Sequence, residues 1–147
     1  MLDIHATYAL AEHAVTIHAN GTFDVKLVPI APAHDGEGAL GRMSLAKEFR
    51  GDLEGTSEGE MLSVMTAVKG SAGYVALERV SGSLHGRTGT FALQHSGTMK
   101  RGAPQLSVTV VPDSGTGQLA GLTGSMRIII DAGKHSYEFD YALDGAS

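Results

Sequence analysis

The chain has 147 residues, a formal net charge of −5, 42% hydrophobic residues, 20 glycines and no cysteine. Its length is typical of one domain, and its hydrophobic content is sufficient for a buried core. The negative charge disfavours nonspecific binding to nucleic acid or to anionic membranes. The absence of cysteine excludes disulfides and thiolate chemistry.

Residues 1–20 are interpreted as an N-terminal extension. Their sequence, MLDIHATYALAEHAVTIHAN, fits either one or two helical turns or a short strand. It contains Asp3 and several histidines without a long apolar run, so it matches neither a secretory signal nor a membrane span. We therefore expect a cytoplasmic protein of bacterial type, with a single domain over residues 21–147.

From residue 22 onward, apolar and polar residues alternate as they do in strands. The pattern covers residues 22–30, 42–49, 52–68, 72–80, 87–99, 105–112, 125–130 and 135–143. Most connections are short and rich in glycine, which favours antiparallel hairpins. We predict an all-β fold: an antiparallel meander of seven to eight strands with little helix, closed into a barrel because closure removes exposed sheet edges.

Four segments resemble a family of small bacterial proteins of unknown function. They read RMSLAKEFRGDLEGTSEGEML, GSAGYVALERVSGSLHGRTGTFALQHSGTM, VVPDSGTGQLAGLTGSMRI and GKHSYEFDYAL. The resemblance covers roughly residues 21–143, and it implies a fold similar to the allene oxide cyclase barrel. It implies no activity, because the family is uncharacterised and the cyclase motif cannot be matched to residues of this chain.

The segment DLEGTSEGEM, residues 52–61, places four carboxylates at even positions, on one face of a strand. The odd face carries Leu53, Ser57 and two glycines. The simplest assignment turns the odd face inward, where its small residues leave room for a ligand or for bulky side chains, and leaves the acids in water. A bulge at the glycines would instead turn Glu54 inward and create a buried acid–base site.

Glu78 and His95 are the candidate catalytic residues. They lie in adjacent predicted strands, and a carboxylate beside an imidazole orients it and raises its basicity. Tyr74 shares the face of Glu78, so Tyr74, Ser57 and Glu54 are the candidate ligand-binding residues. The alternative is that Glu78 and His95 form a buried pair whose only role is to provide each other with a hydrogen-bond partner. The histidine spacing contains no metal-binding motif, and the sequence predicts no metal and no cofactor.

Three functions remain open on this sequence. The first is the binding of a small apolar or amphipathic ligand inside the barrel. The second is an acid–base enzyme, either similar to an isomerase or cyclase or a carboxylate-dependent hydrolase that could process its own chain. The third is a structural barrel without catalysis. The expected partners are a small molecule and a second copy of the chain in a homo-oligomer, with no nucleic acid and no membrane.

Overall fold

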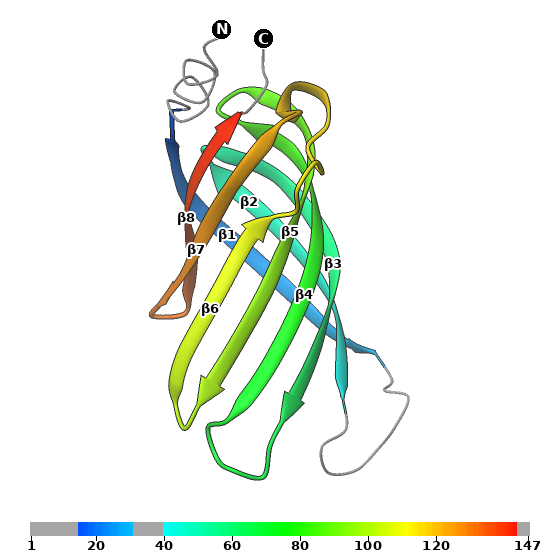
Figure 1. Cartoon of the computed structure of the whole chain (residues 1–147), viewed down its shortest axis with the longest axis vertical. Helices are drawn as coiled ribbons and strands as arrows, with labels where there is room; N and C mark the ends of the chain where they lie inside the picture. Colours follow the sequence, from blue (N-terminus) through cyan, green and yellow to red (C-terminus); the bar gives the residue numbers. More distant parts are fainter. Residues whose placement is uncertain (1–14, 31–39, 144–147) are drawn as a thin grey trace, which may run out of the picture.

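The computed structural model describes residues 15–30 and 40–143, which form a closed antiparallel barrel with its strands in chain order (Figure 1). Its elements are β1 (Ile17–Ile30), β2 (Gly41–Gly51), β3 (Leu53–Met65), β4 (Ala72–Leu84), β5 (Arg87–Lys100), β6 (Ala103–Val110), the short 3₁₀ helix η1 (Gly117–Leu119), β7 (Leu122–Asp131) and β8 (Lys134–Leu143). The predicted meander barrel is confirmed, with eight strands. Among these residues, no helix is long and apolar enough to cross a membrane.

Several strands extend beyond their predicted limits. β1 begins at Ile17 because residues 17–20 pair with β8, so the barrel starts before residue 21. Residues 1–14 of the predicted extension and residues 31–39 of the predicted 31–41 loop lie outside the described residues. β4 continues to Leu84, which leaves only His85 and Gly86 for the turn into β5. Both have positive φ, 47° and 81°, as a tight two-residue hairpin requires.

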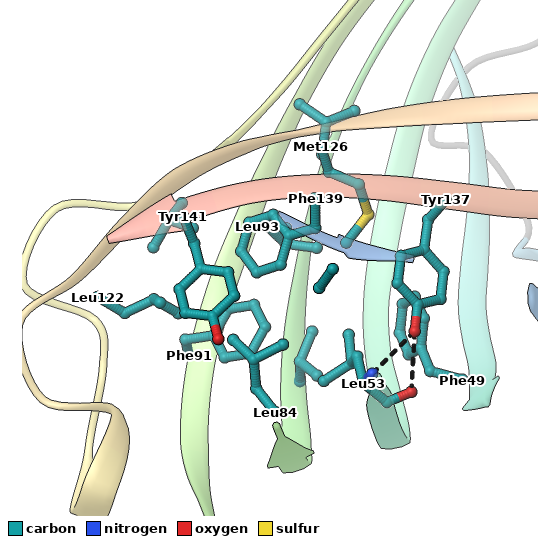
Figure 2. Close-up of a cluster of buried hydrophobic side chains, with 14 of the residues drawn as sticks. Phe49, Leu53, Leu84, Phe91, Leu93, Leu122, Met126, Tyr137, Phe139 and Tyr141 are labelled. Carbon is teal, nitrogen blue, oxygen red and sulfur yellow. Dashed lines mark hydrogen bonds between the residues drawn. The ribbon is translucent and has the colours of Figure 1, made fainter. Parts of the chain in front are cut away.

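One end of the barrel, near the His85–Gly86 turn, is filled by large apolar side chains. We call it the packed end. Figure 2 shows these side chains converging from several strands: Phe49, Leu53, Leu84, Phe91, Leu93, Leu122, Met126, Tyr137, Phe139 and Tyr141. The rings of Phe91 and Phe139 stack with their centroids 6.0 Å apart. Their burial provides the main driving force for closing this end.

Tyr137 fixes the corner between β2 and β3. Its hydroxyl accepts a hydrogen bond from the Leu53 amide at 2.8 Å, drawn in Figure 2, and lies 3.0 Å from the Arg50 carbonyl, to which it donates. Burial of this ring in the barrel raises the pKa of Tyr137, so the hydroxyl stays protonated. A single side chain from β8 thus forms hydrogen bonds with backbone groups at the corner between β2 and β3.

The other end of the barrel is open on one side. β6 pairs with β7 at one position only, Thr109 with Ser125, whereas β5 and β6 pair over eight positions. Figure 1 shows β4, β5 and β6 continuing past the turn that joins β7 to β8. Beyond that turn, β7 and β8 no longer cover the inner wall of these longer strands, and we call this region the open end.

Candidate functional site

The barrel interior holds a cluster of polar side chains centred on Glu78 of β4. Lys47 of β2 donates a hydrogen bond to Glu78 Oε2 at 2.8 Å, and Ser57 of β3 donates one to Oε1 at 2.8 Å. His95 of β5 places its Nε2 atom 2.6 Å from Oε2. Four consecutive strands each contribute one side chain, because these positions all face inward on the alternating pattern.

Glu78 is ionised in this environment although only 1% of the residue is exposed. Burial by itself raises the pKa of Glu78, but the hydrogen bond from His95 and the charge and hydrogen bond of Lys47 outweigh it and hold the pKa at about 2. An ionised carboxylate accepts hydrogen bonds and donates none. The His95 Nε2 atom therefore carries the hydrogen, and Nδ1 of a neutral His95 is left as an acceptor.

Tyr74 continues this chain of contacts toward the open end. Its hydroxyl lies 3.5 Å from His95 Nδ1, which gives the order Glu78, His95, Tyr74. Burial and the negative charge of Glu78 raise the pKa of Tyr74, so its phenol is neutral. A neutral phenol can donate a hydrogen bond to His95 or to an oxygen of a bound molecule.

Gly97 makes room for the Tyr74 ring. A Cβ atom at Gly97 would lie 2.4 Å from Tyr74 Cε1 and 3.3 Å from Leu106 Cδ1. Tyr74 and Leu106 therefore both lie over this glycine on its inner side. The absence of a side chain at Gly97 allows the aromatic ring to lie flat against the wall beside His95.

The predicted Glu78–His95 contact is present in the structure, and Tyr74 joins it. Lys47 is a member of the cluster that was not predicted, although the sequence contains one signal for it. The inward positions of its strand are otherwise apolar, so a lysine among Leu45 and Phe49 requires an anionic partner. The Lys47 ammonium also lies 4.9 Å from the centroid of the Phe23 ring.

Ser57 and Glu54, the other two predicted ligand-binding residues, do not line the open end. Ser57 is buried, and its hydroxyl is engaged by Glu78, so it belongs to the cluster itself. Glu54 is exposed on the outer face, because β3 pairs continuously with β4 and no bulge reverses its alternation. The structure therefore does not support the prediction that Glu54 could turn inward. Glu58 and Glu60 are likewise outside the barrel wall.

The glycines of β3 have a different role from the predicted one. We expected Gly55 and Gly59 to leave space inside the barrel. A Cβ atom at Gly59 would instead lie 2.0 Å from the Leu77 carbonyl oxygen, and one at Gly55 would lie 2.2 Å from that of Ser81. These glycines allow the β3 and β4 backbones to approach each other closely.

Apolar side chains line the inner wall at the open end without being buried. Leu106 is 43% exposed, Met99 is 43% exposed and Met65 is 79% exposed, although all three occupy inward-facing positions. Met65 and Met99 lie on either side of Ala72, and Leu106 lies with the Tyr74 ring over Gly97. This wall combines flexible apolar side chains with one phenolic hydroxyl, a composition suited to small organic molecules.

A second imidazole contact lies at the packed end. His85 Nδ1 is 2.5 Å from the Tyr141 hydroxyl, and His85 Nε2 is 3.5 Å from Asp52 Oδ2. The side chains of His85 and Asp52 are partly exposed, and they connect the β4–β5 turn to the β2–β3 corner. Within the described ranges, no group of three or more His, Asp or Glu side chains could hold a metal ion.

Comparison with known proteins identifies relatives of this chain. Residues 19–141 match the family described as "Protein of unknown function (DUF3224)". The chain is also similar to a crystal structure of a protein of unknown function from the DUF3224 family of Shewanella oneidensis, with 52% identity and a TM-score of 0.86. That similarity covers 90% of this chain and 100% of the other. No curated protein matches. The chain belongs to the DUF3224 family of proteins of unknown function.

Proposed function

We propose that this barrel binds a small apolar or amphipathic molecule against the inner wall of its open end. The observation that carries the proposal is the exposure of two inward-facing apolar side chains, Leu106 and Met99, of which Leu106 lies with the Tyr74 ring over Gly97. Exposed apolar side chains gathered on one surface mark a site at which another molecule can bind. A ligand there would remove this surface from water.

The polar end of such a ligand would contact Tyr74. The Tyr74 phenol is neutral and its bond to His95 is long, at 3.5 Å, so it can turn to donate to a carbonyl or hydroxyl oxygen. His95 is held in place from behind by Glu78, which is itself fixed by Lys47 and Ser57. The cluster thus holds His95 in a fixed position, and the Tyr74 hydroxyl is the group that can donate to a ligand.

Acid–base catalysis is the second candidate, and the order Glu78, His95, Tyr74 favours it. Glu78 accepts from His95 Nε2 and orients its ring, so that Nδ1 lies 3.5 Å from the Tyr74 hydroxyl, where a proton can pass between His95 and Tyr74 or a substrate. Proton transfer of this kind is the chemistry of an isomerase or a cyclase. A hydrolase with two carboxylates has less support, because Glu78 is the one buried carboxylate in the described part of the chain.

A substitution that fills the wall tests the binding proposal. In titrations with anilinonaphthalene sulfonate, we expect Leu106→Trp to weaken binding of this probe at least about tenfold. Ile129→Trp, a matched change on the exposed outer face of β7, should leave the affinity unchanged. Equal affinities in both variants, or no binding by the wild-type protein, would contradict the proposal and favour a purely structural barrel.

Molecules retained by the purified protein distinguish binding from catalysis. Native mass spectrometry followed by solvent extraction should recover an apolar or amphipathic compound from the wild-type barrel and less of it from Leu106→Trp. If the protein converts that compound, His95→Gln should abolish conversion while a bound species remains. Retention without conversion would assign binding alone.

A further inference from the structure

The outer wall of the barrel carries a second apolar surface, separate from the inner wall. We call it the β3–β4 face. It comprises the outward side chains of the four strands β2–β5: Arg42, Ser44, Glu58, Glu60, Leu62, Val75, Leu77, Arg79, Gln94 and Ser96. Leu77 is 56% exposed and Val75 is 53% exposed. Most of these residues line a hollow of about 1120 Å³ in this wall.

Strand register makes the β3–β4 face self-complementary. Leu62 lies beside Val75 across the two strands, and Glu58 lies beside Arg79. A two-fold axis that runs along the strands between β3 and β4 places β3 of one copy over β4 of another. Leu62 then faces Val75 of the second copy. The same rotation brings Glu58 opposite Arg79 of the second copy, twice in each pair.

The charges on this face fit that arrangement. Glu60, which lies beside Leu77, is already paired with Arg42 at 2.6 Å in the same chain. Glu58 and Arg79 are exposed, and neither forms an ion pair within the described residues. The rotation also brings Glu60 opposite Leu77 of the second copy, and Glu60 keeps Arg42 as its partner. Glu58 and Arg79 are the unused charges of the face, and a second copy would supply the opposite charge to each.

The outer rows of the face match as well. Ser44 on β2 and Gln94 on β5 lie in one lateral row with Glu60 and Leu77. The two-fold axis brings Ser44 opposite Gln94 of the second copy, and these are two side chains that can form a hydrogen bond.

We propose that the protein forms a homodimer through the β3–β4 faces of two copies, with strands of the two walls aligned within about 30°. The open end lies at the ends of the strands and stays accessible in this dimer.

Sedimentation equilibrium of the full chain tests the dimer. We expect the wild-type protein to dimerise and Leu77→Glu to weaken dimerisation at least about tenfold, because the new carboxylate would face Glu60 of the second copy. Ile129→Glu, at an exposed outward position of β7, should dimerise like the wild type. A monomeric wild-type protein would overturn the proposal and leave the face to another partner. Equal dimerisation of the Leu77→Glu variant would also overturn it.

Mixing two charge variants tests the orientation of the copies. Glu58→Lys and Arg79→Glu each place like charges opposite each other in their own dimers, so each should be largely monomeric. An equimolar mixture should recover dimers, because a mixed pair joins the new lysine to the new glutamate and native Glu58 to native Arg79. Circular dichroism confirms that each variant is folded. Failure of the mixture to dimerise, while each variant is folded and monomeric, would overturn this geometry.

Discussion

At the scale of single residues, Glu78 is the group on which the interior cluster depends. It neutralises Lys47, orients His95 and accepts from Ser57, and all four side chains are buried. Every buried side-chain nitrogen or oxygen in the described ranges has a hydrogen-bond partner. A network that is fully satisfied holds its members in fixed positions, and the loss of one member leaves others unpaired.

Replacing Glu78 with glutamine should destabilise the protein by about 3–5 kcal/mol, because Lys47 is left as an unpaired buried charge. Urea denaturation measures this change in the free energy of unfolding. Glu54→Gln on the exposed face of β3 is the matched control and should cost less than about 0.5 kcal/mol. Adding Lys47→Met to Glu78→Gln should recover part of the loss. No recovery would show that the unpaired lysine is not the cause.

Acid should remove the contribution of Glu78 to stability. Its pKa is about 2 in the folded protein against an ordinary value of 4.5, so the unfolded chain binds the proton more readily. The stabilisation is present above pH 4.5 and is lost as the pH falls toward 2, and it amounts to about 3 kcal/mol. Unfolding free energies of the wild type and Glu78→Gln should converge across this interval. A constant difference would contradict the low pKa.

At the scale of elements, β4 and β5 form the wall on which Tyr74 and His95 meet. The two strands pair over thirteen positions, from Ala72 with Met99 to Leu84 with Arg87, so their relative position is firmly set. Gly97 lies directly opposite Tyr74 in this ladder. A strand glycine is locally unfavourable, and here its benefit is the space it leaves for the tyrosine ring.

Gly97→Ala should displace the Tyr74 ring and destabilise the protein by about 1–3 kcal/mol, because the new Cβ atom would overlap the ring. Gly73→Ala is the matched control on β4, since the nearest atom to its Cβ would be 3.8 Å away. Its effect should lie within about 0.5 kcal/mol. Denaturation measures both changes. The Tyr74→Ala change should relieve most of the cost of Gly97→Ala, and additive losses would contradict the overlap.

At the scale of the whole molecule, the barrel has two unlike ends. Aromatic and leucine side chains fill the packed end, whereas the single β6–β7 pair leaves the inner wall of the open end uncovered. The side chains that stabilise the barrel and the proposed binding site therefore lie at opposite ends of it. The packed end provides most of the buried apolar area, and the open end keeps a surface that a ligand can cover.

The same substitution at the two ends should show this difference. Leu84→Ala removes a fully buried side chain at the packed end and should cost about 3 kcal/mol or more. Leu106→Ala removes a side chain that is partly in water and should cost under about 1 kcal/mol. Thermal or urea unfolding of the two variants measures the comparison. Similar costs would mean that the open end is packed in solution.

Alternation in the sequence was enough to predict the strands, apart from several of their ends, and the face of each strand that lies inside. The short connections indicated the antiparallel barrel. Glu78 and His95 could be predicted as neighbours from sequence alone, because a period of two gives the face of each residue and a short connection joins their strands. Their exact register is set by the two-residue turn at His85 and Gly86, which the alternation did not specify. The chain of Tyr74, His95 and Glu78 follows from the same local rule. The exposed acids of β3 follow from it too, since no bulge interrupts the strand.

The contacts between side chains from several different strands were decided by the tertiary structure alone. Lys47 and Ser57 reach Glu78 because the registers of two successive hairpins, β2–β3 and β3–β4, combine. Each register depends on a turn whose geometry the sequence pattern does not specify. The partial pairing of β6 with β7 likewise follows from the way eight strands close on one another. Local periodicity sets which way a side chain points, whereas closure of the whole sheet sets what it touches.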